Sequence, residues 1–88
     1  MKINGNFVLR EVAGEWLAIP VGESALKIGG MIVLNPVSRV IWQTLSQEAD
    51  MEAVVQAITD SFDVSREEAW QDAAAFLEQM RTEGLLTE

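Results

Sequence analysis

The stretch Met31-Ile32-Val33-Leu34-Asn35-Pro36 decides the fold of this chain. Its first four residues are apolar and follow two glycines, which is typical of a short strand. Asn35 can then cap the free amides of a helix with its side chain, and Pro36 suits the first helical position, where no amide partner is needed. The chain therefore changes here from strand to helix, and we expect a sheet before Asn35 and helices after it.

Two further strands are predicted ahead of this point. Phe7 to Val12 and Glu15 to Val21 have the composition and alternation of strands, and Ala13-Gly14 joins them as an antiparallel hairpin. Because alanine is strained at positive φ, we expect Gly14 to take the left-handed position of a turn with a bulge, rather than a simple two-residue loop. Met31 to Leu34 would be the third strand, with one edge left unpaired unless a partner or a helix covers it.

Three helices are predicted after this point. The first runs from Pro36 to about Ser46, and the second begins after Asp50, each with an apolar stripe at helical spacing. Ser65 and Glu68 form a capping box that begins the third, and Gly84 is placed to end it, so that Leu85-Leu86 can fold back onto the core. The fold class is therefore α+β: one domain over residues 1 to 88, with a small three-stranded antiparallel sheet followed by three helices.

The composition excludes several kinds of chemistry. The 88 residues include no cysteine and no histidine, so disulfides, thiolate or imidazole metal sites, thiol nucleophiles and a histidine base are all excluded. We therefore expect no enzymatic activity, no cofactor and no metal. The first residues lack the apolar run of a signal peptide and no run of about 18 apolar residues occurs, so we expect a cytoplasmic protein that does not enter a membrane.

The net charge of −8 is unevenly distributed along the chain. Four basic and three acidic residues precede Ser46, whereas two basic and eleven acidic residues follow Leu45. An acidic half of this kind would repel a phosphate backbone, so we expect no nucleic-acid partner. The acidic residues from Asp60 to Asp72 lack the alternating ligands and the glycine of a calcium loop, and we interpret them as a solvated face.

Several short motifs occur together in a fixed order. They are Val12-Ala13-Gly14-Glu15, Met31-Ile32-Val33-Leu34-Asn35 before Val40-Ile41-Trp42, the spacing from Asp72 to Phe76-Leu77, and Glu83-Gly84-Leu85-Leu86. In this order the chain resembles, over nearly its whole length, the PqqD-like family, the recognition elements of ribosomally made and post-translationally modified peptides. One departure is Pro36-Val37-Ser38-Arg39, where the family often has an acidic residue, a hydroxyl residue and glycine. We expect this departure to affect which precursor is bound rather than the fold.

The resemblance implies a winged-helix-like domain that binds the leader segment of a precursor peptide. The leader would add as a strand beside the third strand, with the third helix as the opposite wall, so that main-chain bonds supply affinity and pockets supply preference. The implied peptide-binding residues are Ile28, Met31, Ile32, Val33, Leu34, Ala69, Asp72, Ala73, Phe76 and Met80. From spacing alone, Phe76 fits a core position better than a groove position, so we assign the groove mainly to its neighbours.

The resemblance also implies a second partner, a tailoring enzyme to which the leader is delivered. The usual one is a radical S-adenosylmethionine enzyme, which must bring its own iron–sulfur cluster because this chain offers no cysteine. A structural module that dimerises through the open strand edge stays an alternative, because the same edge serves both purposes. A winged-helix transcription regulator is disfavoured, since residues 66 to 83 hold two basic and five acidic side chains.

Overall fold

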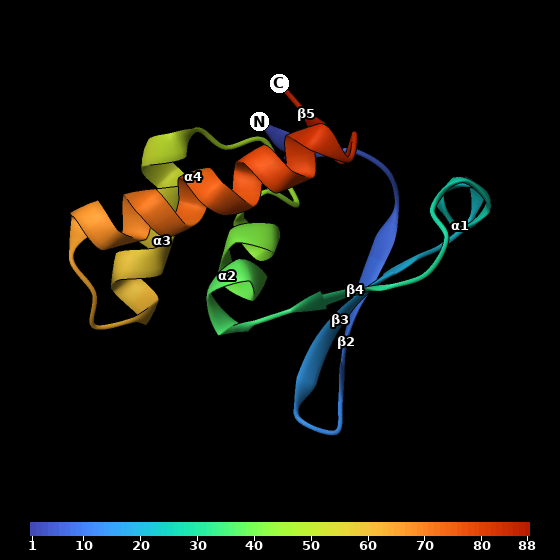
Figure 1. Cartoon of the computed structure of the whole chain (residues 1–88), viewed down its shortest axis with the longest axis horizontal. Helices are drawn as coiled ribbons and strands as arrows, with labels where there is room; N and C mark the ends of the chain where they lie inside the picture. Colours follow the sequence, from blue (N-terminus) through green and yellow to red (C-terminus); the bar gives the residue numbers. More distant parts are fainter.

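The computed structural model describes all 88 residues, and its centre is a three-stranded antiparallel sheet (Figure 1). The strands are β2 (Phe7–Val12), β3 (Glu15–Pro20) and β4 (Ile32–Leu34), in the spatial order β2-β3-β4. In the register, Leu17 lies opposite both Arg10 and Val33. The prediction of three strands in this order is confirmed, although β3 ends at Pro20 and β4 begins at Ile32, each one residue short of the expected limit.

The turn between β2 and β3 differs from the expected bulge. Val12 pairs directly with Glu15, so Ala13 and Gly14 form a two-residue loop with φ angles of 51° and 83°. Positive φ at both central positions is the geometry of a type I′ turn, whose twist matches that of the flanking strands. The prediction of a bulge was wrong, because the twist of the hairpin outweighs the cost of placing alanine in the left-handed region.

A short helix, α1 (Glu23–Lys27), lies between the hairpin and β4, and the sequence patterns above do not predict it. The Ser24 side chain is buried and accepts a 2.8 Å hydrogen bond from the Asn6 amide, which ties this helix to the segment before β2. With only five residues and a glycine at its start, α1 has too few turns to produce a recognisable periodicity.

The three predicted helices are all present, as α2 (Pro36–Thr44), α3 (Met51–Ser61) and α4 (Arg66–Thr82). Each begins at a side-chain cap: Asn35 accepts from the Ser38 amide, Asp50 from the Ala53 amide and Ser65 from the Glu68 amide. These bonds satisfy amides that have no partner within the helix, which explains why the helices begin where the sequence indicates. None of the four helices is long and apolar enough to cross a lipid bilayer.

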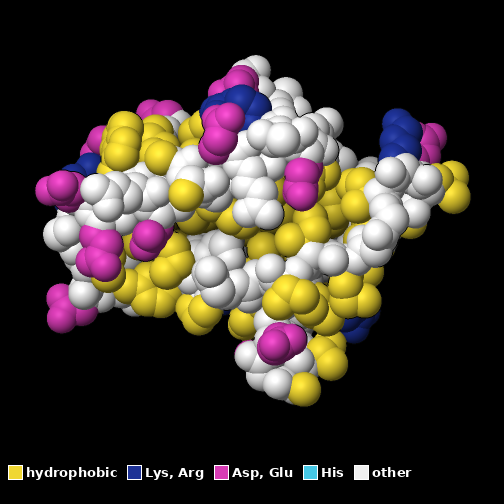
Figure 2. Space-filling model, in the orientation of Figure 1, with side chains coloured by type: hydrophobic (Ala, Val, Ile, Leu, Met, Phe, Trp, Pro, Cys, Tyr) yellow, Lys and Arg dark blue, Asp and Glu magenta, His cyan; other side chains and the backbone are white.

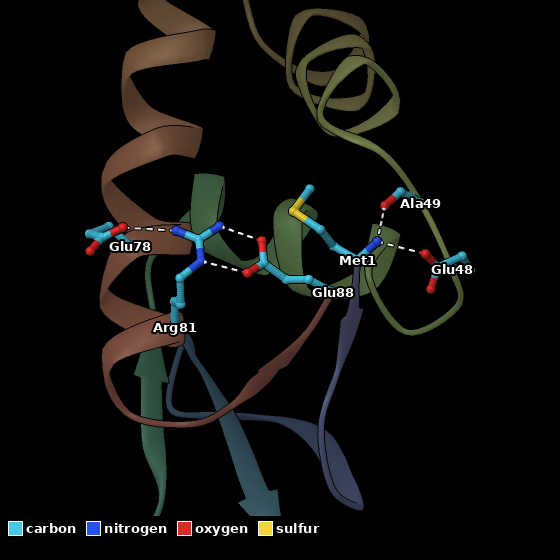
Figure 3. Close-up of polar contacts among 6 residues, drawn as sticks. All are labelled: Met1, Glu48, Ala49, Glu78, Arg81 and Glu88. Carbon is cyan, nitrogen blue, oxygen red and sulfur yellow. Dashed lines mark hydrogen bonds and ion pairs between the residues drawn. The ribbon is translucent and has the colours of Figure 1, made fainter.

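The two ends of the chain pair with each other in a second, two-stranded sheet. Strand β1 (Lys2–Ile3) is antiparallel to β5 (Leu86–Thr87), and Gly84, at a φ of 75°, reverses the chain after α4 so that Leu85 becomes buried. Figure 3 shows ionic contacts on both sides of this sheet: the amino terminus contacts Glu48, and Arg81 contacts Glu78 and Glu88. The fold-back of Leu85-Leu86 is confirmed, whereas the small sheet is not predicted by the sequence.

The core lies between the helices and one face of the larger sheet. Ala18 of β3 and Leu34 of β4 are buried on this inner face, and the ring of Phe7 meets that of Trp42 edge to face at 5.0 Å. Arg39 of α2 lies over the Trp16 ring at 4.9 Å. The helices therefore cover only the inner face, and Figure 1 shows the hairpin turn extending away from them.

Candidate functional site

The free edge of β4 is the first feature of the candidate site. Strand β4 pairs only with β3, so its other edge has no neighbouring strand. The two-residue turn makes Val12 and Glu15 a hydrogen-bonded pair. Hydrogen-bonded and non-bonded pairs alternate along an antiparallel ladder, so the main chain of Leu17 bonds to β2, and the main chains of Trp16 and Ala18 bond to β4. Val33, opposite Leu17, is consequently a non-bonded position, and its N–H and C=O point to the free edge. The alternation gives Met31 the same orientation.

The side chains of this segment alternate between the two faces of the sheet. Ile32 and Leu34 point inward, where Leu34 is buried and Ile32 packs against the core. Met31 and Val33 are 57% and 61% exposed on the outer face. The strand thus anchors itself with alternate side chains and keeps the main chain of Met31 and Val33 available for an added strand.

Helix α4 forms the wall opposite this edge. Asn35, directly after β4, lines a hollow of about 410 Å³ together with Asp72, Phe76 and Gln79 of α4. At the other end of the strand, a hollow of about 330 Å³ is lined by Met31, Ile32 and the residues before them, and by Glu83 and Leu85. Strand β4 therefore runs antiparallel to the second half of α4, with a hollow at each end. We call these two hollows and the strand edge between them the β4–α4 groove.

The structure divides the predicted helix residues between this groove and the core. Asp72 is exposed and Phe76 is partly buried, and both line the larger hollow. Ala69, Ala73 and Met80 are buried at 0%, 0% and 2% exposure and belong to the core cluster. These three share with Leu77 the helical spacing that faces α2 and α3, so they support the wall from behind and do not line it.

Other groove residues lie outside the predicted set. In the larger hollow they are Asn35, Pro36, Val37, Ser38, Ile41, Ala75 and Gln79, and in the smaller hollow they are Lys27, Gly29, Gly30, Glu83 and Leu85. Asp72, Phe76, Gln79 and Glu83 follow one another at intervals of four, three and four residues, which places them on a single stripe of the helix. Extending this stripe from Asp72 would have identified Gln79 and Glu83 from the sequence. Ile28, which is predicted for the site, lies near the start of β4, where it is partly buried and lines the smaller hollow.

Polar and apolar side chains both line the groove. Figure 2 shows hydrophobic side chains in the hollow between α4 and the sheet, with acidic side chains nearby along the helix. Both arginines of α4 are engaged elsewhere, Arg66 with Glu52 and Arg81 with Glu78 and Glu88. The Arg81 guanidinium donates hydrogen bonds to Glu88 that hold the pKa of this carboxyl below its ordinary value. No cluster of three or more acidic side chains is arranged to hold a metal ion.

The outer face of the sheet is largely apolar and uncovered. Val8 and Val12 are 38% and 53% exposed, and they share this face with Leu17, Ile19 and the two exposed residues of the β4 segment. The same face also carries Arg10, opposite Leu17, and Glu15, opposite Val12. A largely apolar face without a covering layer marks a surface suited to a macromolecular partner. A strand added at the β4 edge would widen this face.

The largest hollow in the molecule, about 850 Å³, lies away from the groove. Half of its lining is the continuous segment from Lys2 to Phe7, and Trp42 and Ser46 contribute from α2 and the loop after it. Most of its side chains are polar, and the sheet that contributes Lys2, Ile3 and Thr87 to it has only two residues in each strand. We regard the β4–α4 groove as the candidate site because it combines unpaired main-chain groups with an apolar floor, although it is the smaller space.

Comparisons with known proteins agree with this fold. A solved structure described as TbiB1 in complex with the TbiA(beta) leader peptide is similar to this chain, with a TM-score of 0.72 and 24% identity over 98% of this chain and 94% of the other. No curated protein sequence matches the chain. The family model for coenzyme PQQ synthesis protein D matches residues 6–86. The chain therefore belongs to the PqqD family.

Proposed function

We propose that this protein binds the leader segment of a ribosomally made precursor peptide as an added strand along β4. The observation that carries the proposal is the unpaired edge of β4 at Met31 and Val33, which faces a helical wall and has a partly apolar hollow at each end. Main-chain bonds to such an edge bind an extended peptide irrespective of its sequence, and the hollows select among side chains. Membership of the PqqD family and the similarity to a protein solved with a leader peptide support the proposal.

The proposed role is non-catalytic delivery of the bound leader to a separate tailoring enzyme. Holding the leader and the enzyme at once raises the local concentration of one near the other. The resemblance to the PqqD-like family favours a radical S-adenosylmethionine enzyme, and the uncovered outer face of the sheet is a surface that such an enzyme could contact. We place this activity in the cytoplasm, where ribosomally made precursors first become available.

An amide chemical-shift titration tests the leader-binding proposal. The labelled protein is titrated with the leader half of the precursor peptide whose gene neighbours this one. We expect shift changes to cluster in Met31 to Leu34 and along the groove stripe from Asp72 to Glu83. Changes confined to the hollow near Trp42, or none at millimolar peptide, would contradict leader binding in the groove for this peptide.

Dimerisation through the same edge is the second candidate function. It is favoured by the sheet having two unpaired edges, at β2 and β4, next to an uncovered apolar face. A twofold axis beside β4 would join two sheets into one of six strands. Sizing the protein with and without leader separates the two functions, because peptide and second copy would compete for the same main-chain groups.

A further inference from the structure

The wall of the β4–α4 groove carries negative charge without compensation at one end. Asp72 is the only charged residue that lines the larger hollow. The rest of the lining is apolar, from Val37, Ile41, Phe76, Pro36 and Ala75, or polar without charge, from Asn35, Ser38 and Gln79. At the other end Glu83 lies opposite Lys27, so the charges there are mixed. The larger hollow is therefore the place where charge selects a ligand most clearly.

The Asp72 carboxylate has no partner within the chain. The ion pairs of the molecule involve Glu48, Glu52, Glu78 and Glu88, and none involves Asp72. Its side chain takes part in no hydrogen bond either, although other acidic side chains cap helices or pair along them. The carboxylate is exposed at the mouth of an apolar hollow, so it is free to accept from a ligand without breaking an existing contact.

The floor beside Asp72 suits the stem of a long side chain. Val37 and Phe76 are each partly buried against the core, and both also line the hollow. Lysine and arginine bury an aliphatic stem on apolar surface while their charged ends stay hydrated, and an aromatic ring adds attraction for the cation. An apolar ligand residue would fill the floor but would leave the carboxylate unused, and an acidic one would be repelled.

We infer that the larger hollow is a subsite for a basic residue of the leader, with its stem on Phe76 and Val37 and its cation at Asp72. The inference rests on the proposed function and specifies its substrate class as leaders that carry lysine or arginine at this position. The net charge of −8 also favours the approach of a basic peptide over an acidic one. Asp72 would thus be a specificity-determining residue.

Selection from a random peptide library tests this subsite and does not require the sequence of the leader. The immobilised full chain is presented with displayed random peptides of about 12 residues, long enough to pass the whole β4 edge at about 3.3 Å per residue. The same selection is made with Asp72→Asn and with Asp63→Asn. Asp63 is exposed in the loop before α4 and makes no ion pair or side-chain hydrogen bond, so its variant loses the same charge away from the groove.

We expect peptides bound to the wild type to show lysine or arginine about threefold more often than the starting library at one aligned position, as an exposed ion pair would give. The enrichment should persist with Asp63→Asn and disappear with Asp72→Asn. Absence of a basic preference in the wild type, or a preference equally strong with Asp72→Asn, would overturn the inference. If the chain enriches no peptides at all, or enriches peptides that bind Val33→Pro equally well, the proposed function itself fails.

One selected peptide then provides an equilibrium measurement. The basic residue is replaced by norleucine, which keeps the apolar stem and removes the charge. We expect this change to weaken binding to the wild type about threefold and to leave binding to Asp72→Asn unchanged, with the difference shrinking between about 0.05 M and about 0.5 M salt. Equal losses with both proteins at both salt concentrations would overturn the inference, because the stem alone would then be recognised.

Discussion

Val33 contributes to the proposed site through its main chain rather than through its side chain. Its N–H points to the free edge and its side chain lies 61% exposed on the outer face. Val33→Pro removes the N–H at the free edge without removing a hydrogen bond to β3. We therefore expect leader binding to weaken about tenfold or more, because a main-chain hydrogen bond to the leader is lost and the proline ring disturbs the pairing geometry. Isothermal titration calorimetry with the leader peptide measures the change.

Val33→Ala is the matched control, because it removes most of the side chain but keeps the amide. We expect its affinity for the leader to stay within about twofold of the wild type, since the side chain points away from the groove. Both variants should retain the fold in circular dichroism, because an edge strand tolerates proline where its amide faces outward. Equal affinities of the two variants would exclude pairing with the Val33 amide.

Ala13 and Gly14 hold the two positive-φ positions of the hairpin turn, at 51° and 83°. Asparagine tolerates the first position better than alanine, so we expect Ala13→Asn to raise the free energy of unfolding by about 1 kcal/mol. A Cβ added at Gly14 would meet no atom within 4 Å, so Gly14→Ala reports backbone strain alone and should lower the free energy of unfolding by about 1 kcal/mol. Urea unfolding measures both changes, and signs opposite to these would contradict a type I′ turn in solution.

At the scale of elements, the sequence predicts those structures whose signals are local. The caps at Asn35, Asp50 and Ser65 identify the starts of α2, α3 and α4, because each depends on a bond within one turn. The pairing of β1 with β5 joins residues more than 80 positions apart in strands of two residues, and no local pattern predicts it. The groove cannot be predicted from local patterns either. Only the packing of α4 against other elements shows which of its residues face the core and which face the groove.

The helical wall illustrates this limit in more detail. Ala69 and Ala73 are small residues, which makes them candidates for a close approach of a peptide. Their size instead permits close packing within the core, where both are fully buried. Asp72 and Phe76 are predicted for the groove and do line it, whereas Gln79 lines it without being predicted, because a lone glutamine on a helix carries no specific chemical signal.

Arg81 links the end of α4 to the residue after β5 through Glu88. The two hydrogen bonds, at 3.0 and 2.8 Å, lower the pKa of the Glu88 carboxyl in the folded chain relative to the unfolded one. A lowered folded pKa means that the contact stabilises the fold above the unfolded pKa of about 4.3, and that this stabilisation is lost as the pH falls through the folded value. We therefore expect the wild type to exceed Arg81→Gln in stability at about pH 6, and the difference to vanish by about pH 2.

Urea unfolding of both proteins across this range measures the effect, which should be small because both side chains are solvent-exposed. The carboxyl carbon shift of Glu88, followed by NMR, provides a site-specific control: its titration midpoint should move upward in Arg81→Gln. A midpoint that is the same in both proteins would mean that this contact does not persist in solution.

At the scale of the whole molecule, the two unpaired sheet edges raise the question of stoichiometry. Edge strands invite pairing with another chain, and this sheet is short, with only three residues in β4. The net charge of −8 opposes association of two copies at low salt, whereas a basic peptide brings no such repulsion. We therefore expect the leader complex to contain one protein chain and one peptide in sedimentation equilibrium.

Salt and the Val33→Pro variant distinguish the ways in which this expectation could fail. If free protein dimerises at about 0.5 M salt, where repulsion is screened, and leader dissociates the dimer, both partners use the β4 edge, and Val33→Pro should weaken both associations together. If the dimer persists with leader bound and Val33→Pro does not weaken it, the dimer contact lies elsewhere, at the β2 edge or on the outer face. A third outcome is a dimer that is disrupted by Val33→Pro but is not dissociated by leader at saturating concentration. This outcome would favour the assembly function over peptide recognition, because the β4 edge would then be occupied by the second copy.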